Sequence, residues 1–203
     1  MISRQFTKES EKARFETFID AILAIIMTIL VLEFKVPEEA FPDDRSIQSH
    51  TYHLIPSLIS YFISFSTIVI LWLDHHNLFR LLTRIDIPMV MLNFLFILFL
   101  SATPYTTSLA GRNFYNPFAV NLVAINYLAM NIAFSSIWFY AMKKKMIPEI
   151  LLAEISTKKE NAIILAGILL QLISIPAAYI STYIPFIFFT MILIIHIYRI
   201  WRH

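Results

Sequence analysis

The sequence predicts an all-α integral membrane protein with six transmembrane helices in a single domain, residues 1–203. Three observations favour this fold. Hydrophobic residues make up 58% of the chain, whereas a soluble domain is about 45–50% apolar. They form unbroken runs of about the 20 residues that a helix needs to cross a bilayer, without the alternation of a membrane β-barrel. Lys and Arg gather on one side of these runs, which marks that side as cytoplasmic.

The first predicted span, residues 14–34, lies in the segment RFETFIDAILAIIMTILVLEFKVP. Asp20 comes about one turn after its start, where an ionised carboxylate is costly unless it finds a partner in protein or water. Asp20 lies about 140° around the helix from Ile25, because successive residues turn by about 100°. If Ile25 faces a pore, Asp20 points back into the helix bundle.

The second predicted span, residues 53–74, leads into the segment WLDHHNLFRLLTRID. We expect the partners of Asp20 to come from this segment, because its polar side chains lie at the same depth in the membrane. These candidates are Trp72, His75, His76 and Arg80. Two interpretations stay open, a structural polar cluster and a proton sensor in which a histidine titrates near neutral pH. Two adjacent histidines without an HExxH pattern do not predict a metal site.

The third predicted span, residues 87–110, has Asn93 in its interior and Pro104 near its outer end. We expect Asn93 to form a hydrogen bond to another helix. Pro104 should bend the span at a point where Thr106 or Thr107 can satisfy the freed carbonyls.

The remaining predicted spans are residues 117–142, 161–180 and 184–200. Asn121, Asn126 and Asn131 follow one another in steps of five, so they spread around the fourth helix and share no face. We therefore favour packing over a polar route for these three side chains. The break between the last two spans depends on the short segment STYIP.

The flanking charges set the orientation of the spans. All Lys and Arg residues except Lys35, Arg45 and Arg112 fall on one side. Positive charge is retained in the cytoplasm during insertion. We therefore expect a protein of the cell membrane with both termini cytoplasmic, which requires an even number of spans.

Two connecting segments carry most of the remaining charge. The outer loop after the first span is acidic, through Glu33, Glu38, Glu39, Asp43 and Asp44. It is either an ordinary solvated loop or a vestibule that concentrates cations near a pore mouth. The inner segment KKKMIPEILLAEISTKKE is basic, and we expect its apolar centre to lie along the inner membrane surface.

Several classes of chemistry are excluded by composition. The chain has two glycines and no cysteine. It therefore lacks a Gly-rich phosphate loop, a potassium filter of Gly-containing carbonyl loops, and thiolate metal ligands. No nucleophile and base pair stands out either. We expect no enzymatic activity, no cofactor, no bound metal and no nucleic-acid partner.

Two segments resemble a known family. In the first span, Arg14, Phe18 and Asp20 match the first helix of the endosomal/lysosomal potassium channel family (transmembrane protein 175) in its short prokaryotic form, with Ile19 in place of the family's serine. The missing serine hydroxyl is either lost or replaced, with Thr17 as the candidate. The segment around the second and third spans also matches the family's spacings, at Trp72, His75, His76, Leu78, Phe79, Asp86, Asn93, Pro104 and Tyr105.

The resemblance implies a cation channel that favours potassium. A chain with one set of six spans is then expected to form a homotetramer, with its first helices around a central pore. Selectivity would come from apolar rings and a hydroxyl on those helices. Arg14, Phe18, Asp20, Trp72, His75, His76 and Asn93 would form the supporting polar network. Potassium ions, membrane lipids and further copies of the chain are the expected partners.

One stripe of the first span is the candidate pore lining. Thr28 and Leu32 follow Ile25 by three and seven residues, which keeps them on one helical face. Ile25 and Leu32 would form apolar collars, with the Thr28 hydroxyls between them. Ile29 is the alternative lining residue if the helix is rotated. Without the resemblance, an ordinary packing face with Thr28 bonded to a carbonyl one turn earlier is the simpler interpretation.

Two other functions stay open from the residues alone. The first is a secondary transporter or proton-coupled cation exchanger that uses Asp20 and the histidines. The second is a membrane-embedded scaffold. A channel carries current that follows the potassium gradient, a transporter shows saturable coupled flux, and a scaffold shows neither.

Overall fold

The computed structural model is helical wherever it describes the chain. It describes the backbone of residues 2–32, 34 and 42–201, and the side chains of these residues except 2–10 and 154. None of these residues lies in a β-strand. The helices are α1 (Ile2–Val31), α2 (Asp44–His53), α3 (Ile55–Leu81), α4 (Ile87–Ser101), α5 (Thr103–Arg112), α6 (Pro117–Lys143), α7 (Glu149–Glu154), α8 (Thr157–Ala177) and α9 (Tyr183–Trp201).

Five helical segments of the described chain are long and apolar enough to cross a membrane. They are α3, the continuous stretch of α4 and α5 (Ile87–Arg112), α6, α8 and α9. Each agrees with a predicted span, including the break between α8 and α9 at STYIP. The first predicted span, residues 14–34, lies in α1 as far as Val31, and this helix carries Arg14, Glu16 and Asp20. A crossing by α1 stays a prediction.

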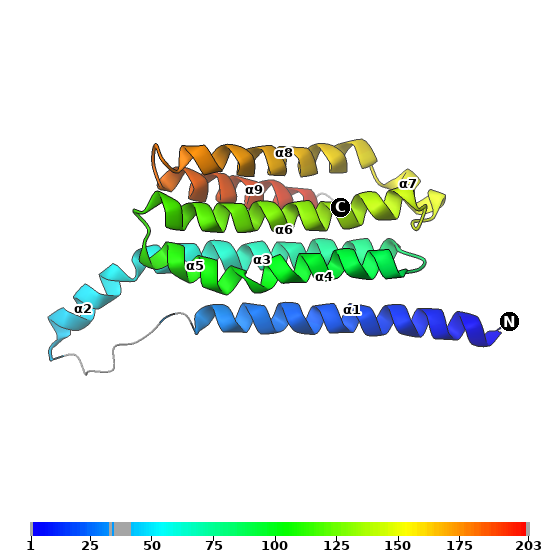
Figure 1. Cartoon of the computed structure of the whole chain (residues 1–203), viewed down its shortest axis with the longest axis horizontal. Coiled ribbons are helices and arrows are strands. Elements are labelled where there is room, and N and C mark those ends of the chain that lie inside the picture. Colours follow the sequence, from blue (N-terminus) through cyan, green and yellow to red (C-terminus); the bar gives the residue numbers. More distant parts are fainter. Residues whose placement is uncertain (1, 33, 35–41, 202–203) are drawn as a thin grey trace.

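The long helices lie side by side with their axes roughly parallel (Figure 1). α6 lies between α4 and α5 on one side and α8 and α9 on the other, and α1 lies along the far edge of the bundle. α1 begins at the right-hand end of the view, whereas α9 ends nearer its middle.

The starts of the long helices follow from local sequence. Asp86 precedes α4, and its carboxylate accepts a hydrogen bond from the Met89 backbone N–H at 3.0 Å. Asn116 precedes α6, and its side-chain oxygen accepts from the Phe118 N–H at 2.9 Å. Both helices also carry proline in their first turn, where no hydrogen-bond donor is needed. Capping of this kind removes unsatisfied N–H groups at helix ends.

The third predicted span is broken, as Pro104 indicated. α4 ends at Ser101, and α5 begins at Thr103 with Pro104 in its first turn. The Thr106 hydroxyl lies 3.2 Å from the carbonyl oxygens of both Ala102 and Thr103 and donates to them. The carbonyl that loses its donor through Pro104 is that of Leu100, four residues earlier. The satisfaction of that carbonyl by Thr106 or Thr107 therefore stays a prediction.

The acidic outer loop is in part a helix, which the sequence analysis did not predict. Asp43 caps α2, because its carboxylate accepts from the Ser46 N–H at 2.8 Å while the Ser46 hydroxyl lies 3.3 Å from the Asp43 N–H. Such reciprocal capping stabilises a short helix start. Glu33, Glu38 and Glu39 lie outside the described residues, so the vestibule stays a prediction.

The basic segment KKKMIPEILLAEISTKKE is also helical in part, because it contains α7. In α7, Leu151 and Leu152 pack against the core, whereas the Ile150 side chain is 75% exposed. The placement of this segment along the membrane surface stays a prediction.

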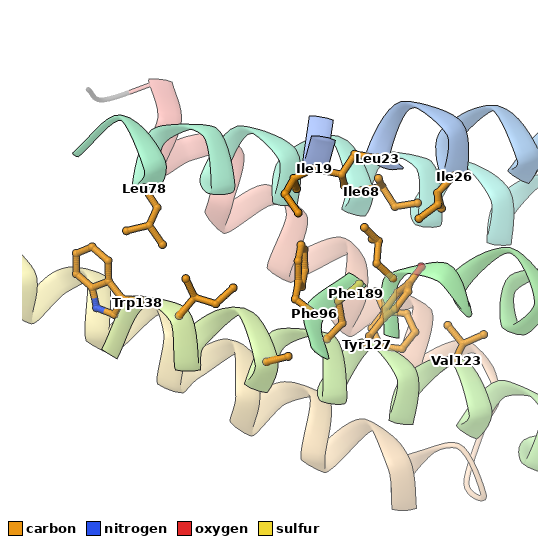
Figure 2. Close-up of a cluster of buried hydrophobic side chains, with 14 of the residues drawn as sticks. Ile19, Leu23, Ile26, Ile68, Leu78, Phe96, Val123, Tyr127, Trp138 and Phe189 are labelled. Atoms are coloured by element: carbon orange, nitrogen blue, oxygen red, sulfur yellow. The ribbon is translucent and has the colours of Figure 1, made fainter. Parts of the chain in front are cut away.

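A buried apolar core joins the helices and fixes their register. Figure 2 shows part of it, with side chains from α1, α3, α4, α6 and α9 pointing toward one another. The labelled residues are Ile19, Leu23, Ile26, Ile68, Leu78, Phe96, Val123, Tyr127, Trp138 and Phe189. α1 is thus held on the bundle by apolar contacts along one of its faces.

The two glycines give a matched test of helix packing. A Cβ on Gly111 of α5 would lie 2.8 Å from the Ser57 Cα of α3, so a backbone would have to move. A Cβ on Gly167 of α8 would lie 3.1 Å from the Asn131 Nδ2, which is a side-chain atom and not backbone. Small residues allow such close approach between membrane helices.

We predict that Gly111→Ala destabilises the fold by about 1–3 kcal/mol, the usual cost of overpacking. Gly167→Ala should change stability much less, because only the Asn131 side chain has to shift by a few tenths of an ångström. The gain in helix propensity of about 1 kcal/mol is common to both variants. Thermal unfolding of both variants in detergent measures the difference. Equal unfolding temperatures would contradict the close contact between α3 and α5.

Candidate functional site

α1 has two distinct faces. Ile19, Leu23, Ile26 and Leu30 are at most 5% exposed and pack against the rest of the bundle. Their spacing of three and four residues places them on one side of the helix. This side is fully used for packing within the chain.

The candidate pore-lining residues lie outside this packing face. The exposed fractions are 57% for Ile25, 70% for Leu32 and 38% for Ile29, and Thr28 is exposed as well. The stripe therefore does not pack against the described residues of its own chain, although this exposure is compatible with packing against other copies. One part of the packing interpretation holds, because the Thr28 hydroxyl donates to the Ile25 carbonyl at 2.7 Å.

Asp20 turns toward the bundle, as its angle from Ile25 predicted. The Trp72 indole N–H of α3 donates to the Asp20 carboxylate at 3.0 Å. The His76 ring stacks on Trp72, with centroids 5.9 Å apart. The expectation that Asp20 finds its partner in this segment is confirmed for Trp72. The other candidates, His75, His76 and Arg80, form no hydrogen bond with Asp20 in the described part of the chain.

His75 belongs to a separate buried contact. Its Nε2 lies 2.9 Å from the Asn93 side-chain oxygen of α4, and Asn93 also donates to the Met89 carbonyl at 2.8 Å. Phe79 stacks on the imidazole with ring centroids 4.2 Å apart. The expected cross-helix hydrogen bond of Asn93 is confirmed, and it links α3 to α4.

Two residues expected near Asp20 lie elsewhere. Arg14 is exposed, and no contact among the described side chains joins it to Asp20. The Phe18 ring packs edge-on against Phe94 of α4, with centroids 6.2 Å apart. The structure thus does not bring Arg14 and Phe18 into one network with Trp72.

The departure from the family at position 19 has a clear structural outcome. Ile19 is fully buried in the apolar core. Thr17 does not supply the missing hydroxyl, because its side chain is exposed and donates to the Ala13 carbonyl of its own helix. The suggestion that Thr17 replaces the family's serine beside Asp20 is wrong.

The asparagines of α6 pack between helices. Asn126 donates to the Thr103 hydroxyl of α5 at 3.1 Å, and Asn131 donates to the side-chain amide oxygen of Gln171 of α8 at 3.1 Å. The packing interpretation is confirmed for these two residues.

Sequence reasoning missed a charged cluster where the C-terminal part of α3, the start of α8 and the end of α9 meet. The Arg199 guanidinium bonds both Asp74 and Glu160, with 3.0 Å to the Glu160 oxygen. His196 Nδ1 lies 3.0 Å from the second Asp74 oxygen. One feature of the sequence could have indicated this cluster. His196 and Arg199 are three residues apart on one helical face, at the same predicted depth as Asp74. α1 has a separate polar contact with the bundle, in which the Lys12 ammonium donates to the Leu82 carbonyl at 2.7 Å.

Known proteins match this chain in sequence and fold. A sequence profile described as endosomal/lysosomal potassium channel TMEM175 matches residues 14–104. A potassium channel of Chamaesiphon minutus is 32% identical over 137 residues, which are 66% of this chain and 68% of that protein. The endosomal/lysosomal proton channel TMEM175 of Gallus gallus is 32% identical over 109 residues, which are 50% of this chain but only 21% of that protein.

A solved structure is similar over nearly the whole chain. It is the crystal structure of a lysosomal potassium-selective channel TMEM175 homolog from Chamaesiphon minutus, with a TM-score of 0.81 and 26% identity. The match covers 94% of this chain and 98% of that one. The likeness therefore extends through α6, α8 and α9, where the sequence profile does not reach.

The hydrogen bond between Trp72 and Asp20 can be tested without changing the carboxylate. We predict that Trp72→Phe lowers stability by about 1–3 kcal/mol, because a partly buried carboxylate loses its donor. Trp201→Phe is the matched control, since the Trp201 side chain is 87% exposed. Thermal unfolding in detergent should separate the two variants. If both unfold at the wild-type temperature, the bond contributes nothing to holding α1.

Proposed function

Because this chain belongs to the endosomal/lysosomal potassium channel TMEM175 family, we propose that it is a potassium-permeable cation channel of the cell membrane. One observation carries the proposal. Ile25, Thr28 and Leu32 are exposed on α1 although the opposite face of the same helix is buried in the core. An exposed stripe with a hydroxyl at its centre, on a helix matched by a family of channels, supports an ion path along α1.

The path requires several copies of the chain. One chain offers a single candidate lining helix, and one helix cannot enclose a pore. Cyclic symmetry repeats the same surface around an axis, and four copies are the assembly that the resemblance implied. We propose that α1 also crosses the membrane, which brings the number of crossings in each protomer to six and leaves both termini cytoplasmic. This arrangement agrees with the opposite directions in which α1 and α9 run along the bundle (Figure 1).

Each side chain of the stripe has a proposed role. Rings of Ile25 and Leu32 act as apolar collars, and such constrictions gate by dewetting. A ring of Thr28 hydroxyls replaces part of the hydration of a passing cation. Ile29, at 38% exposure, takes the place of Ile25 if the helices rotate. Asp20 supports assembly or opening, because it faces Trp72 and not the exposed stripe.

Recording from the purified protein in planar bilayers tests the function. In unequal potassium, the reversal potential should follow the potassium gradient, and current should not saturate at modest concentration. Coupled flux that saturates would favour a secondary transporter. A reversal potential that follows an imposed proton gradient would instead assign proton conduction. Native mass spectrometry from lipid should show a tetramer, and a monomer alone would exclude the shared pore.

The collars predict unequal sensitivities of the ion current at the two apolar positions. Ile25→Asn should wet the narrowest ring, raise the current several-fold and erode the preference for potassium over sodium. Leu32→Ala should change conductance less, because Leu32 lies nearer the outer mouth. Single-channel conductance and bi-ionic reversal potentials measure both effects. If Ile25→Asn keeps the wild-type conductance and reversal potential, Ile25 does not line the ion path.

The hydroxyl ring predicts a separate effect. Thr28→Val keeps the shape of the side chain and removes the hydroxyl, so potassium preference should fall while protein yield stays normal. Thr190→Val is the matched control, since Thr190 of α9 is also exposed and also donates to a carbonyl one turn earlier. Bi-ionic potentials should change in the first variant and not in the second. Equal selectivity in both would show that Thr28 faces lipid.

A further inference from the structure

Two connecting segments are fastened together at the end of the bundle where α1 begins. The turn between α3 and α4 and the segment between α6 and α8 both lie at this end (Figure 1). The backbone N–H and the side-chain hydroxyl of Thr83 both donate to the Met146 carbonyl, each at 2.9 Å. The Tyr140 hydroxyl of α6 donates to the Asp86 carboxylate at 2.9 Å. These hydrogen bonds hold the two segments in a fixed relation.

Exposed cations from both segments gather at this place. We call them the basic junction, which consists of Arg84, Lys143, Lys144 and Lys145. Tyr140 is the common neighbour of the two segments, because the Lys144 ammonium lies 5.9 Å from its ring centroid and Arg84 acts electrostatically on its phenol. In the part of the chain that the structure describes, no ion pair includes a member of the basic junction.

The nearby carboxylates do not match this positive charge. Residues 82–86 and 143–150 carry the four cations of the basic junction but only two acidic residues, Asp86 and Glu149. The Asp86 carboxylate accepts hydrogen bonds from the Tyr140 hydroxyl and from the Met89 N–H. The basic junction is therefore a positively charged surface that can receive an external anion.

Lys145 stands where a helix usually ends in glycine. Its φ is 51°, in the left-handed region. The Met146 N–H donates to the Ala141 carbonyl at 2.9 Å, and the Lys145 N–H donates to the Met142 carbonyl at 3.1 Å. This is the Schellman arrangement, which glycine completes without strain. Strained backbone positions gather at ligand-binding sites, so the lysine indicates a use for its charge beyond ending α6.

Large apolar side chains are exposed directly beside the basic junction. Ile87 at the start of α4 and Ile150 of α7 are each 75% exposed, and Phe139 near the end of α6 is 46% exposed. Cations next to exposed apolar side chains are typical of the boundary between lipid head groups and acyl chains. α4 and α6 also pack against each other, so Ile87 and Phe139 belong to neighbouring helices.

We propose that the basic junction binds the phosphate of an anionic phospholipid, whose acyl chains lie along the exposed apolar side chains of α4 and α6. A guanidinium matches the geometry of a phosphate, and ammonium groups add point charges. Basic pockets between membrane helices recognise anionic head groups in this way. A zwitterionic lipid carries the same phosphate together with a cation of its own, so it gains less from the basic junction. A soluble phosphate ester gains nothing from the apolar side chains.

Native mass spectrometry of the full chain in a mild detergent tests the proposal. The probes are dioleoylphosphatidylglycerol, dioleoylphosphatidylcholine with the same acyl chains, and glycerol phosphate as a soluble phosphate ester. Phosphatidylglycerol should bind about tenfold tighter than phosphatidylcholine, because several cations each favour an anionic head group. An excess of glycerol phosphate should not displace it. Equal binding of the two lipids would overturn the proposal, and displacement by glycerol phosphate would assign a soluble ligand instead.

Two double variants remove equal charge at the same end of the bundle. Arg84→Gln with Lys144→Gln should weaken phosphatidylglycerol binding about tenfold and leave phosphatidylcholine binding unchanged. Lys158→Gln with Lys159→Gln, at exposed lysines at the start of α8, should leave the binding of both lipids unchanged. An equal loss in both double variants would indicate general charge attraction and overturn the site.

Lys145→Gly separates lipid binding from folding. Glycine removes one cation and relieves the left-handed backbone, so this variant should unfold at a higher temperature while it binds phosphatidylglycerol several-fold more weakly. Unchanged phosphatidylglycerol binding in this variant would contradict the site. None of these measurements depends on ion conduction, so the basic junction and the proposed channel stand or fail separately.

Discussion

The architecture depends on one constraint, which is that polar side chains within an apolar bundle must find partners in neighbouring helices. α3 satisfies it in three directions within four residues. Trp72 reaches Asp20 of α1, Asp74 reaches Arg199 and His196 of α9, and His75 reaches Asn93 of α4. Successive residues turn by about 100°, so these side chains leave the helix on different sides. A single segment of α3 thereby sets the positions of three neighbours.

This arrangement separates the attachment of α1 from its exposed stripe. The apolar face of α1, the Asp20 carboxylate and the Lys12 ammonium all engage the same chain. Nothing on the opposite face is needed to hold the helix in place. Ile25, Thr28 and Leu32 are therefore free to meet ions, lipid or other copies of the chain without a cost to the fold.

Sequence reasoning was strongest where local physics decides the structure. Long apolar runs predicted the membrane-spanning helices, and Pro104 predicted the break between α4 and α5. The cost of an unpaired amide in lipid predicted the hydrogen bond of Asn93 to another helix. It was weakest for contacts between helices distant in sequence. The cluster of Asp74, Glu160 and Arg199 requires knowing that α3, α8 and α9 are neighbours. Thr17 was misplaced for a related reason, because its own helix already offered a carbonyl.

The hydrogen bond of Thr28 has a consequence for the sign of the ion. A threonine hydroxyl has one donor hydrogen and two acceptor lone pairs. The donor of Thr28 is already committed to the Ile25 carbonyl at 2.7 Å. Only lone pairs then remain to face outward, and lone pairs attract cations and repel anions. A ring of such residues would discriminate against chloride without carrying any formal charge, so its action would persist at acidic pH, where a ring of carboxylates would be neutralised.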